Sequence, residues 1–378
     1  MEQQSAVDKN PDKKTYSVGI VGATGYTGAE LIRLISTHPY FEVAVLTSRQ
    51  ERGKKMSELY PNLRGFCDLV FCDPNDAGTL AELKRCDVVF FATPHGVAQR
   101  TVKGLITNKD LEQGHYQGPL IVDLSADFRI RDIRVWERHY QQKHEAPELI
   151  QHAVYGLPEV NREAVKMAKL IACPGCYPTS IQLGLLPLIE ADCIDRSTLI
   201  ANSASGITGA GRKAATSLLF TENSDSFKPY SMSGHRHEPE IIQGLHDIAT
   251  RTDNAKSDEN IQLTFVPHLT PAHRGILSTI YARVDDCDRD YQSLFEQRYQ
   301  DEPFIDVLPC GISPETRAVR GSNRIQISVT LRKEAGLLIV HVAEDNLCKG
   351  ASGQAIQCAN LALGLDERTG LDMPALIV

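Results

Sequence analysis

The chain has 378 residues, of which 42% are hydrophobic and 23% are charged, and its formal net charge is −8 at pH 7. This length allows two domains with separate cores, and the composition is that of an ordinary globular protein. The negative charge argues against general binding to nucleic acids or anionic membranes, and no run of about 20 apolar residues predicts a membrane span. Residues 1–14 lack the apolar core of a secretory signal, so we expect a disordered leader. Ten cysteines without such a signal favour reduced thiols in the cytoplasm.

The first predicted element is a strand at residues 17–21, followed by three glycines at intervals of three residues and then a helical pattern. Glycines here allow a tight turn, a close approach of backbone to a pyrophosphate, and close packing of helix on strand. The segment therefore predicts a dinucleotide site at the start of the helix. Its candidate cofactor-binding residues are Gly22, Thr24, Gly25, Tyr26, Thr27 and Gly28.

The second predicted strand, at residues 41–46, indicates which dinucleotide binds. An NAD site usually has an acidic residue about 20 residues after the glycines, but here the strand runs into Ser48 and Arg49. A hydroxyl and a guanidinium suit a 2′-phosphate. The two residues therefore predict NADP (NADPH), against the alternative that Arg49 is a solvated loop residue.

Apolar runs at residues 86–92 and 120–124 continue an alternation of strands and helices. Near-continuous apolar strands are typical of a parallel sheet that is covered on both faces. The sequence therefore predicts a Rossmann-type, doubly wound α/β domain over residues 15–155. Pro94 follows the third strand, and the Ser-Ala-Asp-Phe-Arg segment at 125–129 follows the fourth, where such sheets bind ligands.

After a charged segment at 129–148, which we expect to be helical and exposed, the pattern changes. Residues 324–332 alternate polar and apolar side chains, which indicates a sheet covered on one face only. We therefore expect residues 156–344 to form a second, α+β domain on a largely antiparallel sheet. Its predicted strands are 198–204, 262–266, 275–284, 324–332 and 337–342.

Cys176 follows Pro-Gly and precedes an apolar run, so it is predicted at the N-terminus of a helix. Free backbone amides and the helix dipole stabilise a thiolate at such a place. Two other interpretations compete: an inert buried cysteine, and a dithiol or half of a zinc site formed with Cys173. No second Cys-x-x-Cys or nearby Cys/His set completes a zinc site, so we expect no metal.

Two later segments supply chemical partners for a thiolate. Residues 205–213 are rich in glycine and end in Arg212 and Lys213, which suits an anion, unless the loop is simply flexible. His235 and His237 lie two residues apart, and a pair near a candidate thiolate suggests proton transfer, although a lone histidine is more often structural. These residue types fit a thiolate that attacks an activated acyl group, such as an acyl phosphate, followed by hydride transfer.

Seven motifs in order together resemble the N-acetyl-gamma-glutamyl-phosphate reductases of arginine biosynthesis, and the resemblance runs from about residue 16 to the end. The motifs stand at 22–31, 125–129, 155–159, 174–179, 205–212, 235–240 and 349–354.

The resemblance implies NADPH-dependent reduction of N-acetyl-L-glutamyl 5-phosphate to N-acetyl-L-glutamate 5-semialdehyde and phosphate, through a thioester on Cys176 and with His237 as acid/base. It implies the fold of aspartate-semialdehyde and glyceraldehyde-3-phosphate dehydrogenases, in which residues 345–378 return to the NADP-binding domain and Asn346 lies near the nicotinamide. It also implies a homo-oligomer, usually a dimer or tetramer. We expect Gly206 in the cofactor site, and in the substrate site Ser125, Arg129, Tyr155, Glu159, Arg212, Lys213 and His235.

The sequence departs from the family pattern near the cysteine. Ser180 stands where glycine or alanine is usual, and Cys173 adds a second thiol, which we hypothesise resolves a sulfenic acid on Cys176 under oxidation. Two alternative functions stay open. One is a sister reductase of an aminoadipate derivative on a carrier protein in lysine biosynthesis, and the other is a non-catalytic NADP-binding sensor.

Overall fold

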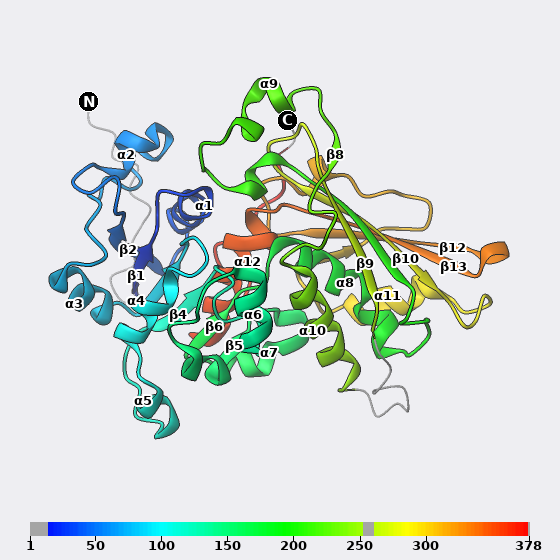
Figure 1. Ribbon diagram of the computed structural model, residues 1–378, viewed down its shortest axis with the longest axis horizontal. Helices are drawn as coiled ribbons and strands as arrows, with labels where there is room; N and C mark the ends of the chain where they lie inside the picture. The colour runs from blue at the N-terminus through cyan, green and yellow to red at the C-terminus, as the bar shows by residue number, and fades with distance from the viewer. Residues whose placement is uncertain (1–13, 252–260, 377–378) are drawn as a thin grey trace.

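The structure is a computed structural model that describes residues 14–251 and 261–376. The expected leader, apart from Lys14, lies outside these residues. Within them, two sheets build two domains that lie side by side (Figure 1). No helix in these two ranges combines the length and the apolar character that a membrane crossing requires.

The first domain is built on a parallel sheet in the order β2-β1-β3-β4-β6-β5. All four residues of both β3 and β4 are buried, as predicted for strands covered on both faces. The prediction of a doubly wound parallel sheet is confirmed. The strands are β1 (Tyr16–Val21), β2 (Phe41–Thr47), β3 (Val88–Phe91), β4 (Leu120–Asp123), β5 (Ala153–Tyr155) and β6 (Leu170–Ala172).

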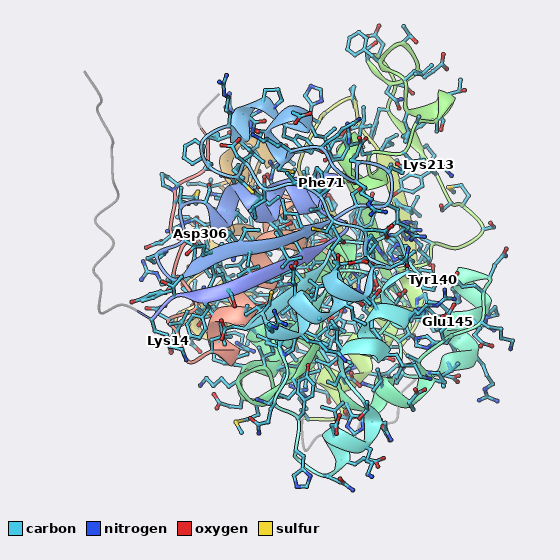
Figure 2. The ribbon with its side chains drawn as sticks, turned by 90° about the vertical axis from the view of Figure 1, so that its left-hand side faces the viewer. Lys14, Phe71, Tyr140, Glu145, Lys213 and Asp306 are labelled. Atoms are coloured by element: carbon cyan, nitrogen blue, oxygen red, sulfur yellow. The ribbon has the colours of Figure 1, made fainter. Side chains whose placement is uncertain are left out.

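The helices of this domain connect successive strands, and one more returns from the far end of the chain. Ile356 and Ala359 of that last helix, α12, are buried in the same apolar cluster as Ile20 and Leu31. Figure 2 is turned so that this domain is toward the viewer, with Phe71 of the same cluster labelled. The helices are α1 (Tyr26–Ile35), α2 (Met56–Leu59), α3 (Ala77–Arg85), α4 (Ala98–Leu105), α5 (Asn108–Glu112), α6 (Ile133–Tyr140), α7 (Pro158–Met167) and α12 (Gly353–Ala362).

The expected domain boundary between residues 155 and 156 falls too early. Strand β6 pairs in parallel with both β4 and β5, through Ile121 with Leu170 and Val154 with Ile171. The parallel sheet therefore extends to Ala172 and ends just before the cysteine motif. A strand of three residues is too short to produce a recognisable periodicity, which is why the sequence pattern did not reveal it.

The second domain is built on a sheet in the order β11-β12-β13-β10-β7-β9-β8. Its pairings are antiparallel, except that β7 with β9 and β11 with β12 are parallel. The expectation of a largely antiparallel sheet is confirmed. The strands are β7 (Leu199–Ser205), β8 (Lys228–Pro229), β9 (Leu263–Leu269), β10 (Ile276–Arg283), β11 (Ile305–Val307), β12 (Ile325–Arg332) and β13 (Leu337–Glu344).

Helix α8 (Cys176–Glu190) lies directly on this sheet, flanked by α10 (Glu238–Ala249) and α11 (Tyr291–Tyr299). Gly184 makes the close approach possible, because a Cβ at that position would lie 2.5 Å from Ile280 Cδ1 and 2.9 Å from Val342 Cγ2. The helix is therefore held against β10 and β13, and this seat fixes the position of its first residue, Cys176. The short helix α9 (Phe220–Asn223) lies on an excursion after β7 (Figure 1).

Candidate active site

Cys176 is the first residue of α8, as predicted, and side chains from two other segments meet it there. A Cβ on Gly175 would lie 2.7 Å from His237 Nε2 and 3.0 Å from Arg129 Nη1. Gly175 therefore leaves the space that the imidazole and the guanidinium occupy. His237 comes from the start of α10 and Arg129 from the loop after β4, so the site lies between the two domains.

Glu240 holds these groups together, although the sequence analysis gave it no role. Its Oε1 accepts hydrogen bonds from the Gly175 amide (2.8 Å) and the Tyr155 hydroxyl (2.9 Å), and its Oε2 accepts one from Arg129 Nη1 (3.2 Å). The side chain is fully buried. The available signal was its place three residues after His237, which puts both residues on neighbouring positions of one helix face.

The protonation of Cys176 differs from what its helix position suggested. Burial and the nearby Glu344 carboxyl raise the pKa of the Cys176 thiol to about 12, although the Tyr177 amide and Arg129 act in the opposite direction. The effect of the helix end is present but is outweighed by desolvation. The thiol of this structure is protonated at neutral pH and requires a base before it can attack.

His237 is suited to be that base. Burial, with the positive charge of Arg129 nearby, holds the pKa of His237 well below its usual value, so the imidazole is neutral. Among the described residues its Nδ1 has no hydrogen-bond partner. His235 is its direct neighbour: the His235 Nδ1 accepts a hydrogen bond from the His237 backbone amide at 3.2 Å. Burial lowers the pKa of His235 as well, to about 4.

The other expected substrate residues lie in different surroundings. Tyr155 reaches the site through its hydrogen bond to Glu240. Ser125 instead donates its hydroxyl to Asp123 at 2.8 Å within the first domain. Glu159 forms a fully buried ion pair with Lys349 at 2.6 Å. Tyr155 is thus joined to the groups around Cys176, whereas the contacts of Ser125 and Glu159 are with the protein interior.

Arg212 belongs to the glycine-rich segment 205–213 but lies beside the other glycine-rich loop, residues 22–28. Its Nη1 donates to the Thr24 carbonyl oxygen (3.3 Å), and its guanidinium lies 5.4 Å from the centre of the Tyr60 ring. Lys213 is exposed on the same excursion and is labelled in Figure 2. Arg212 therefore bridges from the second domain to the loop at 22–28 of the first, and a joint role of Arg212 and Lys213 at an anion stays a prediction.

The glycine-rich loop has the geometry that a dinucleotide requires. Gly22 has φ +84°, a Cβ on Gly28 would lie 2.5 Å from Ala23 Cα, and the Cβ position of Gly25 has nothing within 4 Å. These match the tight turn, the helix packing and the open approach that three glycines provide. The buried Thr93 hydroxyl has no partner in the described part of the chain, which leaves a hydrogen bond for a ligand. The residues fit NADP.

The remaining cofactor candidates lie around this loop. Ser48 is buried at the end of β2, and Arg49 beside it is exposed, as a 2′-phosphate would need. The Thr27 carbonyl accepts the Ser352 hydroxyl at 2.9 Å, which ties the loop to the segment before α12. The Asn346 side chain is fixed by two hydrogen bonds. Its Oδ1 accepts one from the Gly275 amide at 2.8 Å, and its Nδ2 donates one to the Thr208 hydroxyl oxygen at 3.0 Å.

Three further cofactor candidates stand at the expected places in the chain: Tyr26 begins α1, Pro94 follows β3, and Gly206 follows β7. Gly206 also allows a close backbone contact, because a Cβ there would lie 2.8 Å from the Arg274 amide nitrogen. No set of three or more His, Cys, Asp or Glu side chains within 14–251 and 261–376 is arranged to hold a metal ion.

The two unusual residues near Cys176 have buried partners. Cys173 is 1% exposed in the core of the first domain, where its thiol contacts Cys358, whereas Cys176 packs against the core of the second. The Cys173 thiol therefore lies beside Cys358 in the first core, and its hypothesised resolution of a sulfenic acid on Cys176 stays a prediction. The extra hydroxyl of Ser180 is bonded to that of Ser278 at 2.8 Å.

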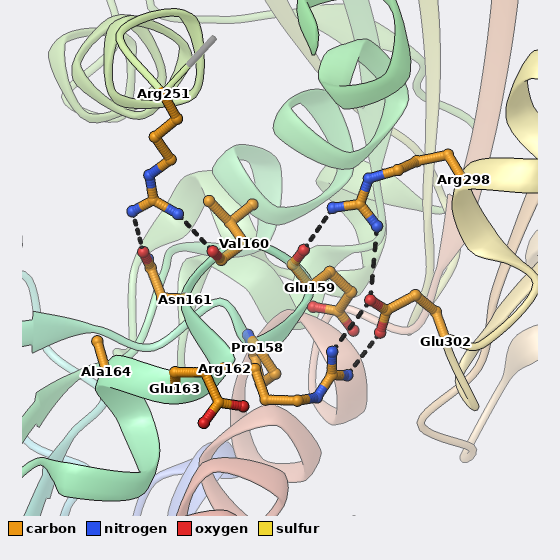
Figure 3. A pocket seen from close by; sticks show the side chains of 10 residues that line it. All are labelled: Pro158, Glu159, Val160, Asn161, Arg162, Glu163, Ala164, Arg251, Arg298 and Glu302. Atoms are coloured by element: carbon orange, nitrogen blue, oxygen red, sulfur yellow. Dashed lines mark hydrogen bonds and ion pairs between the residues drawn. The ribbon is translucent and has the colours of Figure 1, made fainter.

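A separate pocket of about 400 Å³ is lined by residues 158–164 of α7 together with Arg251, Arg298 and Glu302 (Figure 3). Its three guanidinium groups are all bonded within the protein: Arg162 and Arg298 to carboxylates, and Arg251 to Asn161 and a backbone carbonyl. We assign it no ligand.

Comparison with known proteins agrees with this geometry. Residues 17–168 match the family described as semialdehyde dehydrogenase, NAD binding domain, and residues 176–346 match the semialdehyde dehydrogenase, dimerisation domain. The curated N-acetyl-gamma-glutamyl-phosphate reductase of Saccharophagus degradans is 56% identical to this chain, and that of Cellvibrio japonicus is 55% identical. Each alignment covers 95% of this chain and 99% of the relative.

Solved structures with the same fold are aspartate semialdehyde dehydrogenases. The Vibrio cholerae enzyme II complexed with ASA has a TM-score of 0.65 at 15% identity, over 93% of this chain and 99% of that one. The Candida albicans enzyme with NADP also has a TM-score of 0.65, at 20% identity, over 92% of this chain and 98% of that one. At these identities the likeness concerns the fold.

Proposed function

This chain belongs to the N-acetyl-gamma-glutamyl-phosphate reductase family, and on that basis we propose that it makes N-acetyl-L-glutamate 5-semialdehyde for arginine biosynthesis. The substrates are N-acetyl-L-glutamyl 5-phosphate and NADPH, and phosphate is released. The observation that carries the proposal is the meeting of Cys176 with His237 and Arg129 around Gly175.

In this proposal His237 first removes the thiol proton. Its imidazole is neutral at physiological pH and therefore has one unprotonated ring nitrogen, and it lies against the residue that precedes Cys176. The thiolate sulfur then bonds to the acyl carbon while the bond from that carbon to the phosphate oxygen breaks, which leaves a thioester on Cys176. The free amides at the start of α8 stabilise negative charge beside the sulfur.

Arg129 and Glu240 position the substrate. The Arg129 guanidinium is fixed by Glu240 and by the Leu124 carbonyl oxygen (2.7 Å), and its Nε has no partner among the described residues. A buried cation with a free N–H suits an anionic group of the substrate. Because Glu240 also binds the Gly175 amide, one carboxylate aligns the substrate's anion with the nucleophile.

The residues that hold NADPH are the glycine-rich loop for the pyrophosphate and Ser48 with Arg49 for the 2′-phosphate. Arg212, at the Thr24 carbonyl, adds a cation from the second domain. When bound, NADPH supplies the hydride that reduces the acyl group to the aldehyde. Gly206 and Asn346, from the second domain and the returning segment, complete the cofactor site in this proposal.

The test is the reverse reaction, in which NADPH formation is followed with N-acetyl-L-glutamate 5-semialdehyde, NADP and phosphate. We expect activity in the parent, loss of turnover in Cys176→Ser, and full turnover in the control Cys310→Ser, which changes an exposed cysteine. Turnover retained by Cys176→Ser would contradict the nucleophile, and a parent that binds NADP without any turnover would favour the non-catalytic sensor. Activity only with the corresponding aminoadipate semialdehyde would contradict the substrate.

The proposal includes a homo-oligomer, a dimer or tetramer, formed through the second sheet. The matched dimerisation domain supports this, as does Ile200, which is 41% exposed on β7 although it is a large apolar side chain. We expect Ile200→Asp to lower the molar mass measured by light scattering, and an unchanged mass would move the interface elsewhere. We also place the enzyme in the cytoplasm, where its ten free thiols stay reduced.

A further inference from the structure

Glu344, the last residue of β13, is a buried carboxyl. It is 0% exposed, and neither of its oxygens has a hydrogen-bond partner within the described ranges. Buried carboxyl groups are normally hydrogen-bonded or paired, because an isolated charge in the interior is costly. The mechanism above does not use this residue.

The register of β13 directs Glu344 toward the nucleophile. Val340, Val342 and Glu344 alternate along the strand and therefore share one face. A Cβ on Gly184 of α8 would lie 2.9 Å from Val342 and 3.7 Å from Val340, so α8 packs on this face of the strand. Glu344 ends the row, at the first turn of the helix.

Gly350 lies close to both Glu344 and Cys176. A Cβ on Gly350 would lie 2.8 Å from Cys176 Cβ and 3.0 Å from Glu344 Oε1. Both atoms thus lie within 3.0 Å of one point, and no side chain separates them there. Glycine at position 350 is what allows the carboxyl to approach the cysteine.

The cation nearest Glu344 is already bonded elsewhere. Lys349 Nζ donates to Glu159 at 2.6 Å and to Gln357 at 2.8 Å. The Asp345 carboxylate, the other acidic neighbour, is bonded to Arg274 at 3.0 Å. Burial, with the negative charges of Asp345 and Glu159, raises the pKa of Glu344 well above its usual value, although Lys349 acts in the opposite direction.

The charged groups around Cys176 are likewise paired with each other. Arg129 forms its ion pair with Glu240, so these two charges largely offset one another at the sulfur. The Tyr177 amide is the remaining favourable contact for a thiolate. Within residues 14–251 and 261–376, Glu344 is therefore a carboxyl near the sulfur that forms neither an ion pair nor a hydrogen bond.

We propose that Glu344 controls the ionisation of Cys176, such that the two buried groups together hold one negative charge. The thiolate forms while Glu344 keeps its proton, and an ionised Glu344 keeps the thiol protonated. The proposal rests on the proposed role of Cys176 as nucleophile, and it makes Glu344 a positioning residue that acts through the cysteine. Two like charges this close in a poorly solvated site titrate as a pair.

The test measures the thiolate directly. Iodoacetamide reacts with the thiolate, so the alkylation rate of Cys176, read from its peptide by mass spectrometry between pH 6 and 10, reports the thiolate fraction. We expect Glu344→Gln to be alkylated at least about tenfold faster than the parent at pH 8, and to reach any given alkylation rate at a pH about one unit lower or more. Glu344→Asp, which keeps the charge, is expected to retain the parent profile.

The control is Glu302→Gln, which removes another nearly buried carboxylate, one that pairs with Arg162 and does not adjoin Cys176. It should leave the alkylation profile unchanged. If Glu344→Gln does not give a folded protein by thermal melting, Glu344→Met, of similar volume, decides the question.

The proposal would be overturned if Cys176 in the uncharged Glu344 variant were alkylated within twofold of the parent rate. It would also be overturned if the pH dependence of that rate moved to higher pH. This result is independent of turnover, whereas failure of the nucleophile assignment appears as retained turnover in Cys176→Ser.

Discussion

Replacing Glu240 with glutamine removes one negative charge from the centre of the site and keeps the shape of the side chain. The carboxylate accepts hydrogen bonds from Gly175, Tyr155 and Arg129, and it has no contact with solvent. The amide nitrogen of glutamine does not accept hydrogen bonds, so at least one donor loses its partner and the Arg129 charge stays uncompensated. Breaking a buried ion pair from one side costs about 3–5 kcal/mol. We expect the free energy of unfolding to fall by roughly 3 kcal/mol or more.

Urea unfolding of the parent and Glu240→Gln, with equal m values, measures this loss. The matched control is Glu145→Gln, because Glu145 also bonds an arginine, Arg100, at two points of 3.0 Å. The side chains of that pair are 44% and 81% exposed, so its removal should cost less than about 1 kcal/mol. Equal losses in the two variants would refute the reasoning. Turnover should also fall in Glu240→Gln, since the nucleophile helix and Arg129 lose their common anchor.

Three further outcomes are expected. His237→Asn should lower kcat about 100-fold with little change in KM for the acyl phosphate, because proton transfer matters in the transition state; an unchanged kcat in steady-state assays would return the role to His235 or water. Arg49→Ala should raise KM for NADPH by about tenfold and leave KM for NADH nearly unchanged, since only the 2′-phosphate contact is lost; equal increases would contradict the assignment. For Glu30, burial alone would raise the pKa, but bonds from Arg33 and Arg274 lower it from 4.5 to about 2. The ionised Glu30 therefore contributes roughly 3 kcal/mol to the free energy of unfolding above pH 4.5, and this contribution is lost as pH falls toward 2. In Glu30→Gln the free energy of unfolding should consequently fall less steeply between pH 4.5 and 2 than in the parent. Parallel pH dependences of the two proteins would argue against these ion pairs.

Local patterns predicted most of the fold. The alternation over 324–332 is seen as β12, and the three glycines after β1 take the three conformational roles that their spacing indicated. Each of these signals lies within a few residues, where backbone preference and side-chain periodicity act directly. The position of Cys176 at a helix start was predictable for the same reason.

The surroundings of the cysteine were less predictable because they come from distant parts of the chain. Glu240 binds an amide 65 residues earlier, and Arg212 reaches a carbonyl 188 residues earlier. Glu344 ends a strand, where a carboxyl is ordinarily solvated, but here it is fully buried, with Gly350 from a later segment packed close to it. The raised pKa of Cys176 depends on that burial, so the helix position alone pointed to the wrong direction of shift.

The return of α12 to the first domain affects the order in which the protein folds during synthesis. Ile356 and Ala359 fill the same core as β1 and α1, yet about 180 residues separate α12 from the end of β6. At synthesis rates of about 5–20 residues per second, the apolar surface that α12 will cover stays open for about 10–40 s after the parallel sheet has left the ribosome. We therefore expect the first domain to bind chaperones until the second has been made, and a truncation before residue 353 to aggregate rather than yield an isolated cofactor-binding domain.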